Sequence, residues 1–79
     1  MSYTPIGVCS KQINIEVDDN NIVQDVEFIG GCNGNLKGIG ALVKGMTVEE
    51  VIEKLENITC GYKSTSCPDQ LAKALKESF

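Results

Sequence analysis

The spacing of apolar residues changes once along this chain, from alternation before Gly30 to helical spacing after it. Ile13, Ile15 and Val17 alternate with polar residues, which is typical of a strand with one buried face. After Gly30 the apolar residues recur every three or four positions, as they do on one face of a helix. Because strands precede helices, we expect an α+β fold, with an antiparallel meander of about two or three strands followed by about three helices.

The strand half contains a short polar turn between two apolar runs. Residues 18–21 are Asp and Asn, which tolerate the left-handed backbone that a hairpin turn needs. We expect a second strand at roughly residues 22–29, and a further strand at residues 3–8, before Cys9. The second strand is expected to have one apolar and one acidic face, formed by Ile22, Val26 and Phe28 on one side and Asp25 and Glu27 on the other.

The first expected helix has one apolar face and ends at Gly45. Its face is formed by Leu36, Ile39, Gly40 and Val43. A glycine inside a helix costs about 1 kcal/mol relative to Ala. We therefore expect Gly38 and Gly40 to allow the close approach of another backbone or a cofactor.

Two start signals predict the remaining helices. Thr47 and Glu50 form a capping-box pair, followed by inward-facing Val48, Val51, Ile52 and Leu55. Pro68 is favoured at the first helical position and is expected to begin the last helix. The buried face of that helix is expected to consist of Leu71, Ala72, Leu75 and Phe79.

The chain has 79 residues, which is enough for one small domain, residues 1–79, without a large substrate cleft. Cores of this size seldom supply more than about 3–5 kcal/mol. The four cysteines therefore suggest stabilisation by disulfides or by a metal.

The net charge of −4 comes from residues 1–31, which contain one Lys and five acidic residues (1 − 5 = −4). Residues 32–79 contain six Lys and six acidic residues, so their charges cancel. Without Arg or a basic stripe, nucleic-acid binding is not expected. The sequence shows neither a signal peptide nor an apolar run that spans a membrane. We expect a cytoplasmic protein, in which cysteine clusters more often bind metal or do redox chemistry than form disulfides.

The four cysteines, Cys9, Cys32, Cys60 and Cys67, fall at the ends of expected elements rather than within an apolar face. Cys32 and Cys67 precede expected helices, whose N-termini favour the thiolate that binds metals. Because the chain has no His, a site made of cysteine alone would suit zinc or an iron-sulfur cluster. The spacing contains no C-x-x-C motif, so two disulfides or individually reactive thiols remain alternatives.

Other chemistry has little support. Without His, Cys-His and Ser-His catalysis are excluded. The acidic pairs have the spacing of solvated strand and helix faces rather than of a carboxylate active site. The glycines near Gly30 match neither a Walker loop nor a dinucleotide fingerprint.

The run Thr65, Ser66, Cys67, Pro68 and Asp69, together with the other three cysteines, resembles the TSCPD domain in its short, four-cysteine form. In that family the domain also occurs at the C-terminus of cobalamin-dependent ribonucleotide reductases. The resemblance therefore implies a link to ribonucleoside-diphosphate reduction and deoxyribonucleotide synthesis. The 79 residues are too few for a complete reductase, so whether the chain is itself an enzyme stays open.

A more distant similarity is to the NifU/IscU iron-sulfur scaffold. That family uses three cysteines in this order, matching Cys9, Cys32 and Cys67, to hold zinc or a nascent cluster. The scaffold has a His where this chain has Ser66, and it has an acid shortly after its first cysteine, where this chain has Ser10. Cys60 would then supply a fourth ligand and close the site.

The leading hypothesis is a module that binds zinc or an iron-sulfur cluster through the four cysteines, with a ribonucleotide reductase or redox protein as partner. The first alternative is cluster assembly of the NifU/IscU type. The second is a dithiol relay through Cys60 and Cys67. The third is an interaction domain whose acidic hairpin docks on a partner. A homodimer is compatible with each of these hypotheses.

Overall fold

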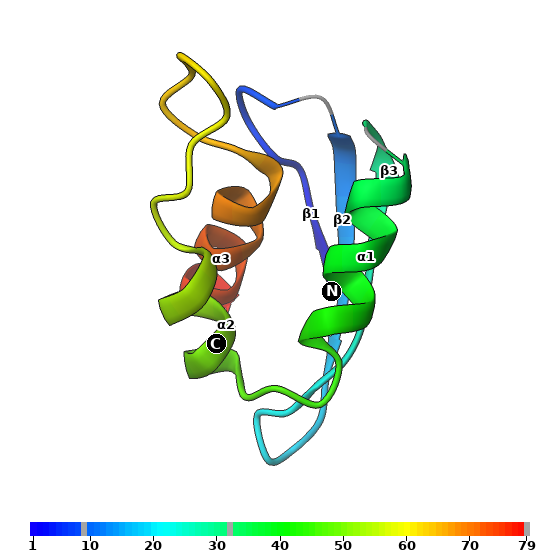
Figure 1. Cartoon of the computed structure of the whole chain (residues 1–79). Coiled ribbons are helices and arrows are strands. Elements are labelled where there is room, and N and C mark those ends of the chain that lie inside the picture. Colours follow the sequence, from blue (N-terminus) through cyan, green and yellow to red (C-terminus); the bar gives the residue numbers. More distant parts are fainter. Residues whose placement is uncertain (9, 32, 79) are drawn as a thin grey trace.

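The computed structural model describes residues 1–8, 10–31 and 33–78. Three antiparallel strands in the order β1-β2-β3 are followed by three helices, as the spacing predicted (Figure 1). The elements are β1 (Ser2–Tyr3), β2 (Ser10–Val17), β3 (Val23–Gly30), α1 (Asn33–Val43), α2 (Val48–Leu55) and α3 (Cys67–Ser78). The expected strand at residues 3–8 is shorter and earlier, because Pro5 cannot donate to a ladder and Gly7 turns the chain at φ +75°.

The predicted hairpin turn is confirmed. The side chain of Asp18 accepts hydrogen bonds from the backbone N–H groups of Asn20 and Ile22, both at 2.9 Å. Asn21 adopts the left-handed conformation, with φ 61°. The hydrogen bonds that stabilise the turn therefore come from residues of the turn itself, independently of packing against the rest of the chain.

A β-bulge changes which residues of β3 face the core. Glu16 pairs with Asp25 and Val17 with Val23, so Gln24 is an extra residue on β3. Val23 and Val26 are consequently both buried although they are three positions apart. The expectation that Ile22 shares the inner face is wrong: Ile22 is half-buried and bridges to Thr47, while Val23 is fully buried.

The helix signals located the helices to within a few residues. In the predicted capping box, the Glu50 N–H donates to Thr47 Oγ1 at 3.1 Å and the Thr47 N–H donates to Glu50 Oε1 at 3.2 Å. Gly45 follows α1 with φ +85°. The last helix begins at Cys67, one residue before Pro68, because Ser66 Oγ accepts the Asp69 N–H and thus caps the helix.

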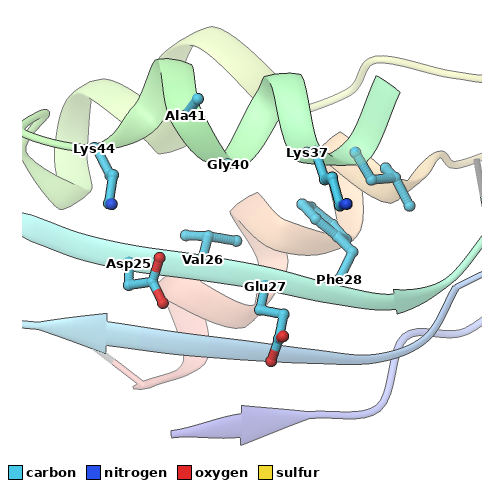
Figure 2. A pocket seen from close by; sticks show the side chains of 9 residues that line it. Asp25, Val26, Glu27, Phe28, Lys37, Gly40, Ala41 and Lys44 are labelled. Carbon is cyan, nitrogen blue, oxygen red and sulfur yellow. The ribbon is translucent and has the colours of Figure 1, made fainter. Parts of the chain in front are cut away.

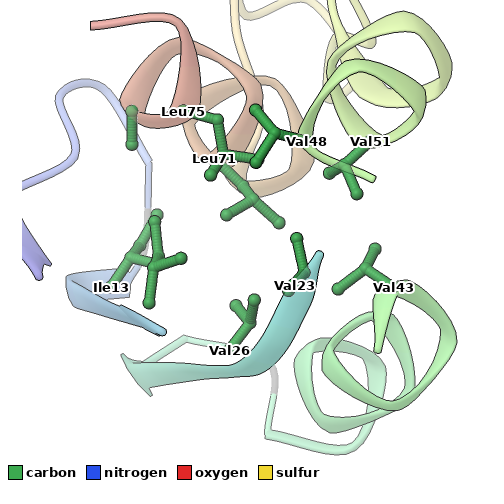
Figure 3. Close-up of a cluster of buried hydrophobic side chains, with 10 residues drawn as sticks. Ile13, Val23, Val26, Val43, Val48, Val51, Leu71 and Leu75 are labelled. Carbon is green, nitrogen blue, oxygen red and sulfur yellow. The ribbon is translucent and has the colours of Figure 1, made fainter. Parts of the chain in front are cut away.

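Helices α2 and α3 lie over one face of the sheet, and α1 lies along the β3 edge, so that together they enclose a cluster of aliphatic side chains (Figure 3). The cluster contains Ile13, Ile15, Val23, Val26, Val43, Val48, Val51, Leu71, Ala74 and Leu75. Burying one such Val, Leu or Ile contributes about 1.5–3 kcal/mol. Phe79, which we expected on the buried face of α3, lies outside the described residues. No described helix is long and apolar enough to cross a membrane.

Candidate functional site

Described residues of three segments lie at one end of the molecule, which we call the thiol end: residues 4–8 and 10–11, residues 28–31 and 33–37, and residues 57–68 (Figure 1). The structure describes Cys60 and Cys67, whereas Cys9 and Cys32 lie outside the described residues. Contacts among the described residues join the segments, since Ser10 pairs with Gly30 in the sheet and also contacts Cys67.

Cys60 and Cys67 line the same groove, which has a volume of about 260 Å³. One wall is the beginning of α1, and the other is the loop before α3 together with the first turn of α3. The lining residues are Asn35, Leu36, Ile39, Ile58, Thr59, Cys60, Ser66, Cys67 and Pro68. Cys60 is exposed and Cys67 is buried. The groove therefore has two cysteines in a mostly apolar lining.

Cys67 is the first residue of α3, directly after the capping residue Ser66. Its Sγ lies 3.2 Å from Ser10 Oγ, in a buried hydrogen bond in which either group can donate. The hydroxyl of Ser10 can donate to the sulfur when the cysteine is a thiolate. Ser10 directly follows Cys9 in the sequence. The residue next to one expected ligand, Cys9, therefore contacts a second expected ligand, Cys67.

Cys60 is held by a tight turn. Its carbonyl oxygen accepts a hydrogen bond from the Lys63 N–H at 3.0 Å, and Gly61 has φ +58°. The Cys60 N–H donates to the Thr65 carbonyl at 3.2 Å, which closes the loop at the start of α3. The backbone of the loop thus brings Cys60 to the same groove as Cys67.

A buried carboxylate connects this loop to α3. Asp69 is 1% exposed and accepts hydrogen bonds from Thr65 Oγ1 at 2.5 Å, the Asn57 N–H at 2.7 Å and Lys73 Nζ at 2.7 Å. Burial acts to raise the pKa of Asp69. The hydrogen bonds from Lys73, Thr65 and Asn57, together with the charge of Lys73, outweigh burial and hold that pKa below its usual value.

Gln70 extends the same network to the N-terminal segment. Its Nε2 donates to Thr65 Oγ1 at 3.0 Å, and its Oε1 accepts from the Ile6 N–H at 3.1 Å and the Tyr3 hydroxyl at 3.4 Å. Burial, with a smaller effect from the charge of Glu77, raises the pKa of Tyr3. Sequence reasoning missed these network residues. A signal was available, since two polar residues directly precede Leu71 and Ala72 in the last helix.

The expected four-cysteine site lies only partly within the described residues. Among them, no group of three or more His, Cys, Asp or Glu side chains is placed to hold a metal. Two of the four expected ligands lie outside that part of the chain. The structure brings Cys60 and Cys67 to one groove, and the assignment of Cys9 and Cys32 stays a prediction.

A second hollow, of about 410 Å³, follows the seam between β3 and α1 and contains no thiol among its lining residues (Figure 2). Asp25 and Glu27 lie on the strand side, and Lys37 and Lys44 on the helix side. Asp25 and Glu27 are exposed, as we expected for the acidic face of β3.

The close approach predicted for the glycines of α1 is confirmed at Gly40. A Cβ at Gly40 would lie 2.6 Å from the carbonyl oxygen of Val26. A Cβ at Gly38 would meet nothing within 4 Å, so no described backbone approaches Gly38 closely. The N–H and the C=O of Ile15 both form hydrogen bonds with Met1, on the side of β2 away from β3. Because Val26 is the residue of β3 opposite Ile15, its own N–H and C=O point away from β2, towards the outer edge of the sheet. The backbone of α1 covers this edge at Gly40.

A comparison with protein families identifies the TSCPD domain, whose model matches residues 1–79. Comparisons with curated proteins and with solved structures found no match. The similarity to the NifU/IscU scaffold therefore stays a prediction.

Proposed function

Because this chain belongs to the TSCPD domain family, we propose that it is a metal-binding module accessory to ribonucleoside-diphosphate reduction. In this proposal Cys9, Cys32, Cys60 and Cys67 together hold one zinc ion or one iron-sulfur cluster. The module acts beside a ribonucleotide reductase or a related redox protein in the cytoplasm.

The observation that carries the proposal is the groove shared by Cys60 and Cys67. The residue after Cys9 bonds to Cys67 Sγ at 3.2 Å, and the helix that begins one residue after Cys32 forms the opposite wall. Thiolates are the ligands that both zinc and iron-sulfur clusters prefer. The donor chemistry of this end of the chain therefore fits either group.

A bound zinc ion would cross-link the loops of the thiol end, and a bound cluster would add electron transfer. The chain contributes the rigid support. The turn after Cys60 and the buried network around Asp69 hold the α2–α3 loop against α3. Four thiolates leave no open coordination position, which favours a structural or electron-transfer role over cluster delivery.

The primary test is the metal content of untagged protein that is purified without oxygen from iron-supplemented cells and, in parallel, from zinc-supplemented cells. We expect one equivalent of zinc, or one cluster with its visible absorption, and protection of all four thiols from alkylation. Protein without metal whose four thiols all react freely with an alkylating reagent would contradict the proposal.

Variants of the α2–α3 loop separate ligands from bystanders. Cys60→Ser and Cys67→Ser are each expected to lose most of the metal and to lower the midpoint of thermal unfolding. Tyr62 is fully exposed in the same loop, so Tyr62→Ser is the matched control and should keep both. Unchanged metal content and stability in Cys67→Ser would show that the shared site is wrongly assigned.

A dithiol relay is the second candidate, because Cys60 and Cys67 line one groove. In that role the two thiols form a disulfide and pass two electrons and two protons to a disulfide of the partner. Alkylation followed by mass measurement, with and without reductant, detects this disulfide. An assay of ribonucleoside-diphosphate reduction with the purified chain added, and with its Cys60→Ser variant, tests the link to the reductase. No change of rate on addition of either protein would contradict that link.

A further inference from the structure

Two buried side chains from distant parts of the chain meet at the thiol end. Ser10 begins β2 and Cys67 begins α3, so they lie 57 residues apart in the sequence. The distance between Ser10 Oγ and Cys67 Sγ is 3.2 Å, and the two residues are only 4% and 7% exposed. A buried hydroxyl needs a hydrogen-bond partner. Among the described residues, this sulfur is the partner that the structure gives to the Ser10 side chain.

The position of Ser10 is fixed by contacts other than this hydrogen bond. Ser10 pairs with Gly30 in the sheet. The segment that leads into β2 is attached to the beginning of α3, because the Ile6 N–H donates to Gln70 Oε1 at 3.1 Å. The Ser10 hydroxyl is therefore held close to Cys67 by the fold.

The two cysteines of the groove have different surroundings. Cys60 is exposed, and its hydrogen bonds among the described residues are made by its backbone. Cys67 is buried at the N-terminus of a 12-residue helix, where the helix dipole favours negative charge. A hydroxyl donor adds to this effect, since hydrogen bonds to a charged acceptor are stronger than those to a neutral one. Cys67 is thus the sulfur that a second side chain supports.

We propose that Ser10 is a positioning residue of the metal site, whose hydroxyl donates a hydrogen bond to the Cys67 thiolate and fixes where that sulfur lies. The inference deepens the proposed function and rests on it, because it concerns a metal held in part by Cys67. Groups that hydrogen-bond to metal ligands orient them, and their loss typically weakens metal binding by about 10–100-fold. Hydrogen bonds to the sulfurs also help to set the reduction potential of an iron-sulfur cluster.

The first test uses Co²⁺ as the probe, because it binds the same kinds of ligand as zinc and its absorption reports on the sulfur atoms. Removal of the donor in Ser10→Ala leaves the electrons of the Cys67 sulfur less tightly held. We therefore expect the sulfur-to-cobalt absorption bands to move to longer wavelength, and the Co²⁺ affinity in competition with a chelator to fall about tenfold. Ser64 is an exposed serine of the α2–α3 loop, so Ser64→Ala is the matched control and should change neither.

A second variant separates the hydrogen bond from packing. Ser10→Thr keeps the hydroxyl and adds a methyl group at a buried position. We expect its absorption bands to stay at the wild-type wavelength even where the methyl group lowers stability, which urea unfolding measures for every variant. Equal shifts of the bands in Ser10→Ala and Ser10→Thr would show that packing, and not the hydroxyl, is responsible, and would overturn the proposal.

The hydrogen bond is also tested without added cobalt. In protein with ¹³C-labelled cysteine, used as purified and kept reduced, Ser10→Ala should shift the Cβ resonance of Cys67 and leave that of Cys60 in place. The Cys67→Ser variant identifies the resonance by its absence. An unchanged Cys67 resonance would contradict the contact.

The outcomes distinguish this inference from the proposed function. Wild-type protein that binds no Co²⁺ would refute the metal site and the role of Ser10 with it. Equal Co²⁺ affinity and identical bands in the wild-type protein and Ser10→Ala would refute the role of Ser10 alone.

Discussion

At the scale of single residues, the last residue of the TSCPD run has a structural role. Asp69 is almost fully buried, and its three hydrogen bonds come from the loop, from Thr65 and from Lys73. Thr65 and Ser66 act beside it: Thr65 also accepts from Gln70, and Ser66 caps α3 while donating to the Ile58 carbonyl at 2.6 Å. These contacts hold Cys60 and Cys67 in place without touching either sulfur.

Replacing this carboxylate should therefore weaken the fold. In Asp69→Asn, an amide NH₂ group replaces one carboxylate oxygen and faces groups that themselves donate hydrogen bonds, so at least one buried hydrogen bond is lost. We expect the free energy of unfolding to fall by about 2–4 kcal/mol. Lys73→Gln is the control, because Lys73 is 45% exposed and its loss should cost at most about 1 kcal/mol. Urea unfolding at pH 7 measures both. Equal losses of unfolding free energy in Asp69→Asn and Lys73→Gln would show that the buried hydrogen bonds of Asp69 do not stabilise the fold.

At the scale of elements, the packing of α1 on β3 depends on one glycine. Gly40→Ala would place a Cβ 2.6 Å from the Val26 carbonyl oxygen, so the helix must move away from the edge of the sheet. We expect a loss of about 1–3 kcal/mol. Gly38→Ala on the same helix meets open space and should instead stabilise the protein by about 0.5–1 kcal/mol. Thermal unfolding of Gly40→Ala and Gly38→Ala measures both effects. A neutral or stabilising Gly40→Ala would contradict the close packing of α1 on β3.

At the scale of the whole molecule, stability should depend on pH through Asp69. Its pKa in the folded protein is lower than the value of about 3.9 expected for the unfolded chain. Its contribution is therefore present above about pH 4 and is lost as the pH falls through the folded value. We expect the free energy of unfolding to fall on acidification below about pH 4, with a smaller slope in Asp69→Asn. Equal slopes in urea unfolding at several pH values would exclude Asp69 as the source.

The sequence by itself determined the features that depend on neighbouring residues. The fold class, the hairpin turn, the capping box and the acidic face of the sheet follow from local spacing and local hydrogen bonds, and each was predicted. The family could also be inferred, because the run from Thr65 to Asp69 is contiguous.

Tertiary structure decided everything that depends on which distant segments meet. The bulge at Gln24 selects Val23 for the core instead of Ile22, because pairing with β2 sets the register of β3. The burial of Asp69, the contact of Ser10 with Cys67 and the groove shared by Cys60 and Cys67 join residues from separate elements. The spacing of residues along a chain does not predict such tertiary contacts. They are stabilised by packing and hydrogen bonds that form only when the whole chain folds.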